Sequence, residues 1–297
     1  MRSNYDRLYI LIVELILNTH RNMEDRNFFT LESILNLDEF KACTYELPIV
    51  LGKTAVTNKI VIKDLVDLPH ILVGGATGQG KTSALHGMIT SLLRKKRPTE
   101  LQLVLIDPKH CEFDKYASVA KGFLAEIPGI CNPILTDCTE ATLALKNLCD
   151  VMDKRFGLLT TAGVSNIQEY NAKYKNGDLK KEQGYNFMPY VVIVCDEFGD
   201  LKITGGKEVE ASIIRLAGCG HRVGIHLIIS TQRVYNNIIS GFIKANFPAR
   251  IAFRVLFPSD SMLILDQPGA SGLRGKGDMI FYSSDEKQHV QGAFVDL

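Results

Sequence analysis

Gly75-Ala76-Thr77-Gly78-Gln79-Gly80-Lys81-Thr82 matches the pattern G-x-x-x-x-G-K-[ST] at every fixed position. The apolar run Ile71-Leu72-Val73 precedes it and predicts a buried strand, and residues 82–93 have the spacing of an amphipathic helix. Glycines allow the backbone to wrap around phosphate oxygens, with loop N–H groups and the helix N-terminus directed at the anion. The pattern predicts a phosphate-binding loop, and the predicted nucleotide-binding residues are Gly75 to Thr82 together with Ser83.

Two residues of this loop carry the predicted chemistry. The Lys81 ammonium is expected to reach the β- and γ-phosphates of a nucleoside triphosphate, and the Thr82 hydroxyl is expected to bind Mg²⁺. The predicted cofactors are therefore ATP and Mg²⁺. A glycine-rich turn that binds nothing is the alternative, and the complete motif between a strand and a helix disfavours it.

Polar residues also end two other apolar runs. Asp196 and Glu197 follow Val191–Cys195, and Gln232 follows Ile228–Thr231. Asp196 is expected to hold the Mg²⁺ through water, and Glu197 to orient and deprotonate the attacking water. Gln232 is expected to sense the γ-phosphate. Two solvated acids at a strand end would be the plainer interpretation alone, but with the phosphate loop the pair favours ATP hydrolysis over a GTPase switch.

Strand-like and helix-like segments alternate through most of the chain. Residues 101–106, 190–195, 225–230 and 250–255 are dense in Val, Ile and Leu, as strands buried on both faces must be. Helices are expected over residues 82–93, from residue 137 or 139 to 159, over 207–217 and over 236–245, with a surface loop over 173–184. This alternation predicts an α/β fold with a mostly parallel central sheet and helices on both faces.

Composition limits the classes of protein. The 297 residues include 34 Lys+Arg and 33 Asp+Glu, a net charge of +1, so any nucleic-acid contact must come from a local basic patch. The seven cysteines form no C-x-x-C pair, which indicates reduced thiols and disfavours a zinc site. The apolar run Leu8–Leu17 is interrupted by Glu14 and is shorter than the roughly 20 residues of a membrane span. The predicted location is the cytoplasm.

Further short motifs are distributed in order along the chain. They are Pro69-His70-Ile71-Leu72-Val73-Gly74, Ile106-Asp107-Pro108-Lys109, Asp196-Glu197-Phe198-Gly199-Asp200-Leu201, Gly224-Ile225-His226-Leu227, Thr231-Gln232-Arg233, Ile243-Lys244-Ala245-Asn246, Pro248-Ala249-Arg250-Ile251-Ala252-Phe253 and Gly275-Lys276-Gly277-Asp278-Met279. With the phosphate loop, they resemble the motor domain of the FtsK/SpoIIIE translocases from about residue 29 to the C-terminus. The resemblance implies a RecA-like P-loop ATPase that forms a hexameric ring, hydrolyses ATP at subunit boundaries and passes double-stranded DNA through its channel.

The same resemblance places Arg233 and Lys244 near the DNA backbone. A motor that grips any sequence is expected to contact phosphates rather than base edges. Ordinary surface charge, or an ion pair at a subunit interface, is the alternative for both residues. The chain departs from the family pattern after Arg233, where Val234 and Tyr235 follow, and at Pro258, where the family commonly has a lysine.

Another departure concerns the arginine that completes a neighbouring subunit's site by stabilising transition-state charge. His221 occupies its usual column, and the resemblance leaves Arg222 and Arg215 as two candidates. Two other functions therefore stay open beside a double-stranded DNA translocase. One is a coupling or secretion ATPase that moves single-stranded DNA or protein, and the other is a degenerate ATP-binding assembly factor.

Two parts of the chain are expected. Residues 1–68 resemble a shortened N-terminal segment of helices and strands, with a helix within 1–28, a short helix over 30–35 and strands over 47–51 and 59–62. Residues 69–297 are the predicted motor domain. The expected partners are double-stranded DNA and further copies of the chain, and another protein is expected to supply any membrane or partitioning attachment.

Overall fold

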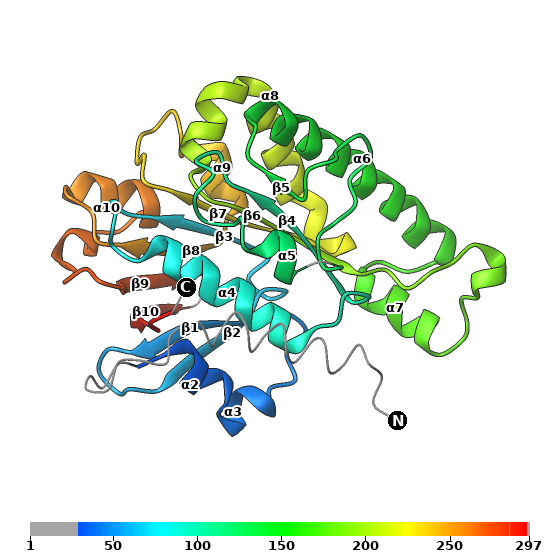
Figure 1. Cartoon of the computed structure of the whole chain (residues 1–297), viewed down its shortest axis with the longest axis horizontal. Coiled ribbons are helices and arrows are strands. Elements are labelled where there is room, and N and C mark those ends of the chain that lie inside the picture. Colours follow the sequence, from blue (N-terminus) through cyan, green and yellow to red (C-terminus); the bar gives the residue numbers. More distant parts are fainter. Residues whose placement is uncertain (1–28, 121, 285, 296–297) are drawn as a thin grey trace.

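The computed structural model describes residues 29–120, 122–284 and 286–295, which form one ten-stranded sheet with helices on both faces (Figure 1). Its order is β2-β1-β10-β9-β8-β3-β7-β6-β4-β5. The strands, in chain order, are β1 (Pro48–Thr54), β2 (Ile60–Asp64), β3 (His70–Gly74), β4 (Leu101–Ile106), β5 (Ile134–Leu135), β6 (Tyr190–Cys195), β7 (Ile225–Thr231), β8 (Ala249–Phe253), β9 (Asp278–Ser283) and β10 (Glu286–Gly292).

The sheet has a parallel half and an antiparallel half. Neighbours from β8 through β3, β7, β6 and β4 to β5 are parallel, and neighbours from β2 through β1, β10 and β9 to β8 are antiparallel. β6 and β7 are buried along their whole length, as their continuous apolar sequences require. The predicted α/β class with a mostly parallel sheet is confirmed.

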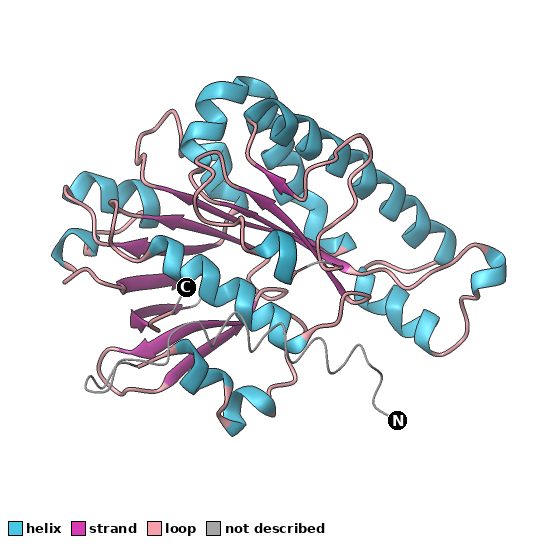
Figure 2. Cartoon of the chain, viewed as in Figure 1, coloured by secondary structure: helices cyan, strands magenta, loops and turns pink. Residues whose placement is uncertain are grey.

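The helices form a layer on each side of the sheet, with α4 on one face and α6 and α8 on the other (Figures 1 and 2). The α-helices are α2 (Leu31–Leu35), α3 (Asp38–Lys41), α4 (Lys81–Lys95), α5 (Tyr116–Val119), α6 (Cys138–Ala162), α7 (Ile167–Lys175), α8 (Phe198–Cys219), α9 (Gly241–Asn246) and α10 (Pro258–Leu265). The short 3₁₀ helices are η1 (Lys181–Gln183), η2 (Gly220–Val223) and η3 (Ala270–Gly272).

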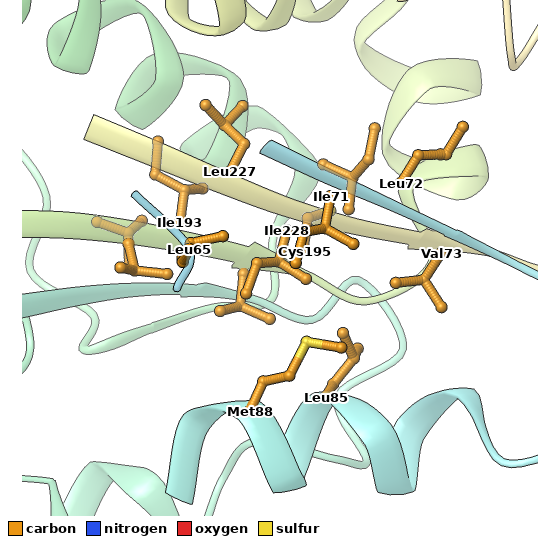
Figure 3. Close-up of a cluster of buried hydrophobic side chains, with 14 of the residues drawn as sticks. Leu65, Ile71, Leu72, Val73, Leu85, Met88, Ile193, Cys195, Leu227 and Ile228 are labelled. Carbon is orange, nitrogen blue, oxygen red and sulfur yellow. The ribbon is translucent and has the colours of Figure 1, made fainter. Parts of the chain in front are cut away.

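Apolar packing against one face of the sheet holds α4 in place. Leu85 and Met88 point from this helix towards Ile71 and Val73 of β3 (Figure 3), and all four side chains are fully buried. Each buried side chain of this size contributes about 2 kcal/mol, so the helix cannot tilt without losing several contacts. The first turn of α4, which follows the phosphate loop, is thereby held against the end of β3.

Three sequence predictions differ from the structure. The helix expected over 207–217 is the second half of α8, which begins at Phe198 and is interrupted at Gly206, where φ is 56° and ψ is −131°. The helix expected over 236–245 begins only at Gly241, where the Ser240 hydroxyl accepts from the amide of Ile243. The loop expected over 173–184 is wrong in part, since α7 extends to Lys175 and η1 lies inside the range.

The N-terminal strands belong to the main sheet. β1 pairs with β10, so that residues from the two ends of the described chain lie side by side. The helix expected over 30–35 is present as α2, capped by Thr30, and the helix expected within 1–28 lies outside the described residues. The boundary expected after residue 68 stays a prediction. Within the described part of the chain, no helix is long and apolar enough to cross a membrane.

Candidate nucleotide-binding site

The phosphate loop connects the end of β3 to the start of α4. Gly75, Gly78 and Gly80 have φ values of 153°, 72° and 113°, which side-chain-bearing residues rarely adopt. A Cβ atom on Gly80 would also lie 2.9 Å from the Cα of Gly277. Glycine is therefore required at Gly80 for both its conformation and the close approach of a second segment.

Lys81 begins α4 and turns back over the loop. Its Nζ donates to the carbonyl of Ala76 at 3.0 Å. Burial lowers the pKa of Lys81, while the nearby carboxylates of Glu197 and Asp196 act in the opposite direction. The loop therefore concentrates one cation opposite two acids, as a site for a phosphate–metal complex requires.

Two backbone contacts brace the loop from outside. The amide of Ala76 donates to the carbonyl of Arg254 at 2.9 Å, and the amide of Gly277 donates to the carbonyl of Gln79 at 2.9 Å. These segments follow β8 and precede β9, far along the chain from the loop itself. The sequence motif around residues 275–279 is thus part of the wall of the site.

The acidic pair, Asp196 and Glu197, lies at the carboxyl end of β6. This strand pairs with β7, and β7 pairs in turn with β3. Asp196 is buried, and burial raises the pKa of its carboxyl group. Its Oδ1 accepts from the amide of Glu197 at 3.0 Å. Glu197 has a φ of 54°, an unusual value for a residue with a side chain and one that often marks functional sites.

Three donors from two segments surround the Glu197 carboxylate. Its Oε1 accepts from Thr231 Oγ1 at 3.1 Å, and the amide of Gln232 lies 3.3 Å from both carboxylate oxygens. Lys109 Nζ lies 3.4 Å from Oε2. A Cβ atom on Gly199 would lie 2.9 Å from Thr231 Oγ1, so glycine there lets α8 approach the end of β7.

Gln232 links the acidic pair to the phosphate loop. Its backbone contacts Glu197, and its side-chain oxygen accepts a hydrogen bond from the hydroxyl of Thr77. Gln232 is therefore in contact with both the phosphate loop and the acidic pair. The structure therefore brings Lys81, Glu197 and Gln232, predicted from separate strand ends, to one edge of the sheet.

The residues predicted to hold Mg²⁺ have suitable chemistry. Thr82 lies half-buried in the first turn of α4, and Asp196 lies buried at the end of β6. Mg²⁺ prefers oxygen ligands and commonly uses one or two protein groups together with substrate phosphates. The Thr82 hydroxyl and the Asp196 carboxylate therefore fit this ion, and the ion would neutralise the charge of the buried carboxylate.

Sequence reasoning gave no role to Lys109, which reaches the site from the loop after β4. The carboxylate of Asp107 organises this loop, because it accepts from the amides of Lys109, Cys111, Glu112 and Phe113 at 2.7–3.2 Å. The Asp-Pro-Lys segment after an apolar run was the available signal. Its contact with Glu197 depends on β4 lying beside β6, which residue spacing alone does not reveal.

Of the two candidate arginines for a neighbouring site, Arg222 lies away from the phosphate loop of its own chain. Arg222 is in η2, which leads into the amino end of β7, whereas Gln232 follows its carboxyl end. Seven residues of strand separate the two ends by roughly 23 Å. Arg222 donates to the carbonyl of Ser165 at 3.3 Å, and Arg215 pairs with Asp153 at 2.6 Å.

The two predicted DNA contacts are ion-paired. Arg233 Nε lies 2.9 Å from Asp200 Oδ1, and Lys244 Nζ lies 2.5 Å from Asp266 Oδ1. Arg250 also pairs with Asp266. A phosphate group would have to replace or join these carboxylates.

Comparison with solved structures shows the same fold in other proteins. The pCW3 conjugation coupling protein TcpA, in its monomer form with ATPγS, superimposes with a TM-score of 0.72 at 24% identity, covering 92% of this chain and 71% of TcpA. The cytoplasmic domain of the Type VII secretion ATPase EccC of Thermomonospora curvata gives a TM-score of 0.72 at 20% identity, covering 91% of this chain and 32% of that solved chain.

Sequence comparison identifies the family. DNA translocase FtsK of Chlorobaculum tepidum is 45% identical over 270 residues, which are 90% of this chain and 32% of that protein. FtsK of Haemophilus influenzae is 37% identical over 297 aligned residues, 94% of this chain and 54% of that protein. The chain thus spans about a third to a half of the length of these relatives. The family profile for FtsK/SpoIIIE matches residues 30–235, and the chain belongs to the FtsK/SpoIIIE family.

Proposed function

We propose that this chain is the ATP-hydrolysing motor of a double-stranded DNA translocase. The observation that carries the proposal is the convergence of Lys81, Glu197 and Gln232 at the carboxyl edge of a parallel sheet. Membership of the FtsK/SpoIIIE family supports DNA as the moved substrate. The cytoplasm, where ATP and DNA are both available, is the proposed place of action.

Each residue has a proposed task in hydrolysis. Residues 75–83 bind the phosphates of ATP, with the Lys81 ammonium on the β- and γ-phosphates. Thr82 and Asp196 would hold Mg²⁺, which neutralises phosphate charge when bound. Glu197 takes the proton of the attacking water, and Gln232 reports the state of the γ-phosphate to the segment that follows it.

A ring of subunits is part of the proposal. Arg222 lies at the amino end of β7, too far from the phosphate loop of its own chain to act there, so it would serve the site of a neighbouring subunit. A hexamer in which each site receives one such arginine fits this placement. Arg215 is already paired with Asp153, and its use in a neighbouring site requires that pair to open.

Movement of single-stranded DNA is the second candidate. The segments predicted to face DNA carry exposed aromatic side chains, with 62% of Tyr235, 74% of Phe242 and 63% of Phe257 accessible to solvent. Aromatic rings stack on unpaired bases, whereas the cations Arg233 and Lys244 already have acidic partners. This candidate uses the same ATP site with a different substrate.

Steady-state phosphate release, measured without DNA, with linear duplex and with single strands, tests the proposal. A double-stranded DNA translocase is stimulated several-fold by duplex, and the Lys81→Ala variant loses this activity. Stimulation by single strands alone selects the second candidate. ATP binding without turnover under all three conditions selects an assembly factor and contradicts the proposal.

A further inference from the structure

Three donor groups surround the Glu197 carboxylate in this structure and make four contacts with its two oxygens. A carboxylate offers about four lone-pair positions. Thr231 Oγ1 and the Gln232 amide contact Oε1, and the same amide and Lys109 Nζ contact Oε2. An attacking water must compete with these donors, and on Oε2 its competitors are Lys109 and the shared Gln232 amide.

Lys109 is the partner best able to withdraw. The Thr231 hydroxyl is buried, and the Gln232 donor is a backbone amide at the end of β7. The Lys109 side chain, in contrast, is 40% exposed, and a flexible four-carbon stem carries its ammonium group. Its 3.4 Å contact with Oε2 is also the longest of the four.

Hydrogen bonds hold the backbone that carries Lys109, whereas its side chain is partly exposed to solvent. Asp107 is 1% exposed and accepts four backbone amides of the turn. His110 takes a φ of 53° within this turn. The hydrogen bonds to the buried Asp107 carboxylate fix the point from which the Lys109 side chain extends over Glu197, and they hold His110 in its unfavourable φ.

We propose that Lys109 is a positioning residue that restrains Glu197 and suppresses hydrolysis in the absence of DNA. The inference rests on the proposed function, in which Glu197 accepts the proton of the attacking water. With Lys109 on Oε2, the carboxylate is held among its donors and kept from the water. When Lys109 withdraws, Oε2 becomes the acceptor, and the buried donors still hold Oε1 in place.

The test compares Lys109→Met, which has similar length and no charge, with the full chain. We expect its phosphate release without DNA to rise about two- to fivefold, the factor that corresponds to a partly exposed ion pair. The rate with saturating duplex is expected to stay close to that of the parent, so the stimulation ratio falls by the same factor. Lys109→Arg, which keeps the cation, should restore the low DNA-free rate.

Lys146→Met makes the same chemical change on the exposed face of α6 and should leave both rates unaltered. An equal or lower DNA-free rate in Lys109→Met overturns the inference, and so does a rise that Lys109→Arg shows as well. Equal binding of ADP by all variants, measured by calorimetry, shows that the fold and the phosphate loop are intact. If the parent chain itself releases no phosphate under any condition, the proposed function fails, which is a different result from a slow Lys109→Met variant.

Discussion

At the carboxyl end of β6, Glu197 combines an unfavourable backbone conformation with a closely surrounded carboxylate. Its φ of 54° turns the chain directly into α8, and its side chain meets donors from β7 and from the loop after β4. Strain of this kind persists only where the surrounding structure holds it in place. Here the close packing of Gly199 against Thr231 supplies part of that support.

The Glu197→Gln variant separates binding from chemistry. The amide has the size of the carboxylate but cannot take a proton, so we expect phosphate release to fall at least about 100-fold. Calorimetric binding of Mg–ATP should stay within a few-fold of the parent, because residues 75–83 are unchanged. Glu208→Gln, on the exposed side of α8, is the matched control. Normal turnover in Glu197→Gln would place the general base elsewhere.

A pair of buried histidines makes stability depend on pH. His226 Nδ1 lies 2.8 Å from the carbonyl of Pro69, and His70 Nδ1 accepts from the amide of Leu227 at 3.0 Å. Burial lowers the pKa of His226 from 6.5 to about 4, and burial and the neighbouring histidines lower the pKa of His70 in the same direction. The unfolded chain therefore binds protons more readily than the folded chain just below pH 6.5.

This linkage predicts acid sensitivity. The folded state keeps His226 neutral, whereas the unfolded chain binds a proton at this residue below about pH 6.5. The free energy of unfolding is therefore not reduced by this effect above about pH 7, and it decreases as the pH falls from 6.5 towards 4. From pH 7.5 to pH 5, His226 alone should lower the free energy of unfolding by about 2 kcal/mol, measured by urea titration. The difference between the two pH values should shrink in His226→Gln. It should persist in His110→Asn, since the His110 side chain is 61% exposed.

At the scale of elements, apolar runs made the parallel half of the sheet predictable. β4 and β6 have the bounds expected from sequence, because strands covered on both faces need unbroken Val, Ile and Leu. β10 has no such signal, since Val290 is its one buried apolar residue among polar neighbours. It becomes a strand because β1 and β9 supply hydrogen-bonding partners on both sides. Pairing of this kind is a tertiary effect that local sequence does not encode.

The candidate site likewise has a part that the sequence predicts and a part that depends on tertiary contacts. Asp196 and Glu197 directly follow a strand that the sequence reveals, and Lys81 follows another such strand through the phosphate loop, so their meeting at one sheet edge was predictable. The contacts of Lys109 with Glu197 and of Gly277 with the phosphate loop join loops distant in sequence. They depend on strand order, which places β4 beside β6 and brings the segment before β9 to the loop after β3.

The N-terminal strands give a prediction about the expected boundary after residue 68. Leu47, Ile49 and Leu51 are almost completely buried in the main core, and the amide of Val50 donates to Ser91 of α4 at 3.2 Å. At about 2 kcal/mol per buried side chain, their loss removes roughly 6 kcal/mol, comparable with the whole stability of a typical domain. It also exposes one edge of β10.

A fragment of residues 69–297 should therefore unfold without a sharp thermal transition or form aggregates, as seen by calorimetry and gel filtration. Val56→Ser, in the exposed turn between β1 and β2, alters the same region without removing packing and should unfold like the parent. A fragment with the parent's transition temperature would show that residues 69–297 are an independent domain, as the sequence led us to expect.

For the whole molecule, charge distribution decides how DNA can be gripped. The net charge of +1 gives no general attraction to a polyanion, so binding must come from a few placed cations. Arg233 and Lys244 are the proposed ones, and each already has a carboxylate partner. When a DNA phosphate replaces that carboxylate, the cation loses one attractive interaction as it gains another, so the net electrostatic free energy of binding is small. The contact still releases counterions from the duplex.

Duplex affinity should consequently fall steeply with salt. Each phosphate contact adds about −0.9 to the slope of log K against log salt concentration, so Arg233→Gln and Lys244→Gln should each make the slope shallower by about 1. These slopes are measured by fluorescence anisotropy of a labelled duplex at several salt concentrations, in the presence of a non-hydrolysable ATP analogue. Lys154→Gln, on the exposed face of α6, should keep the parent slope. A slope that neither proposed variant changes would remove both residues from the DNA contact, and unpaired bases stacked on Tyr235 and Phe242 would then be the next contact to test.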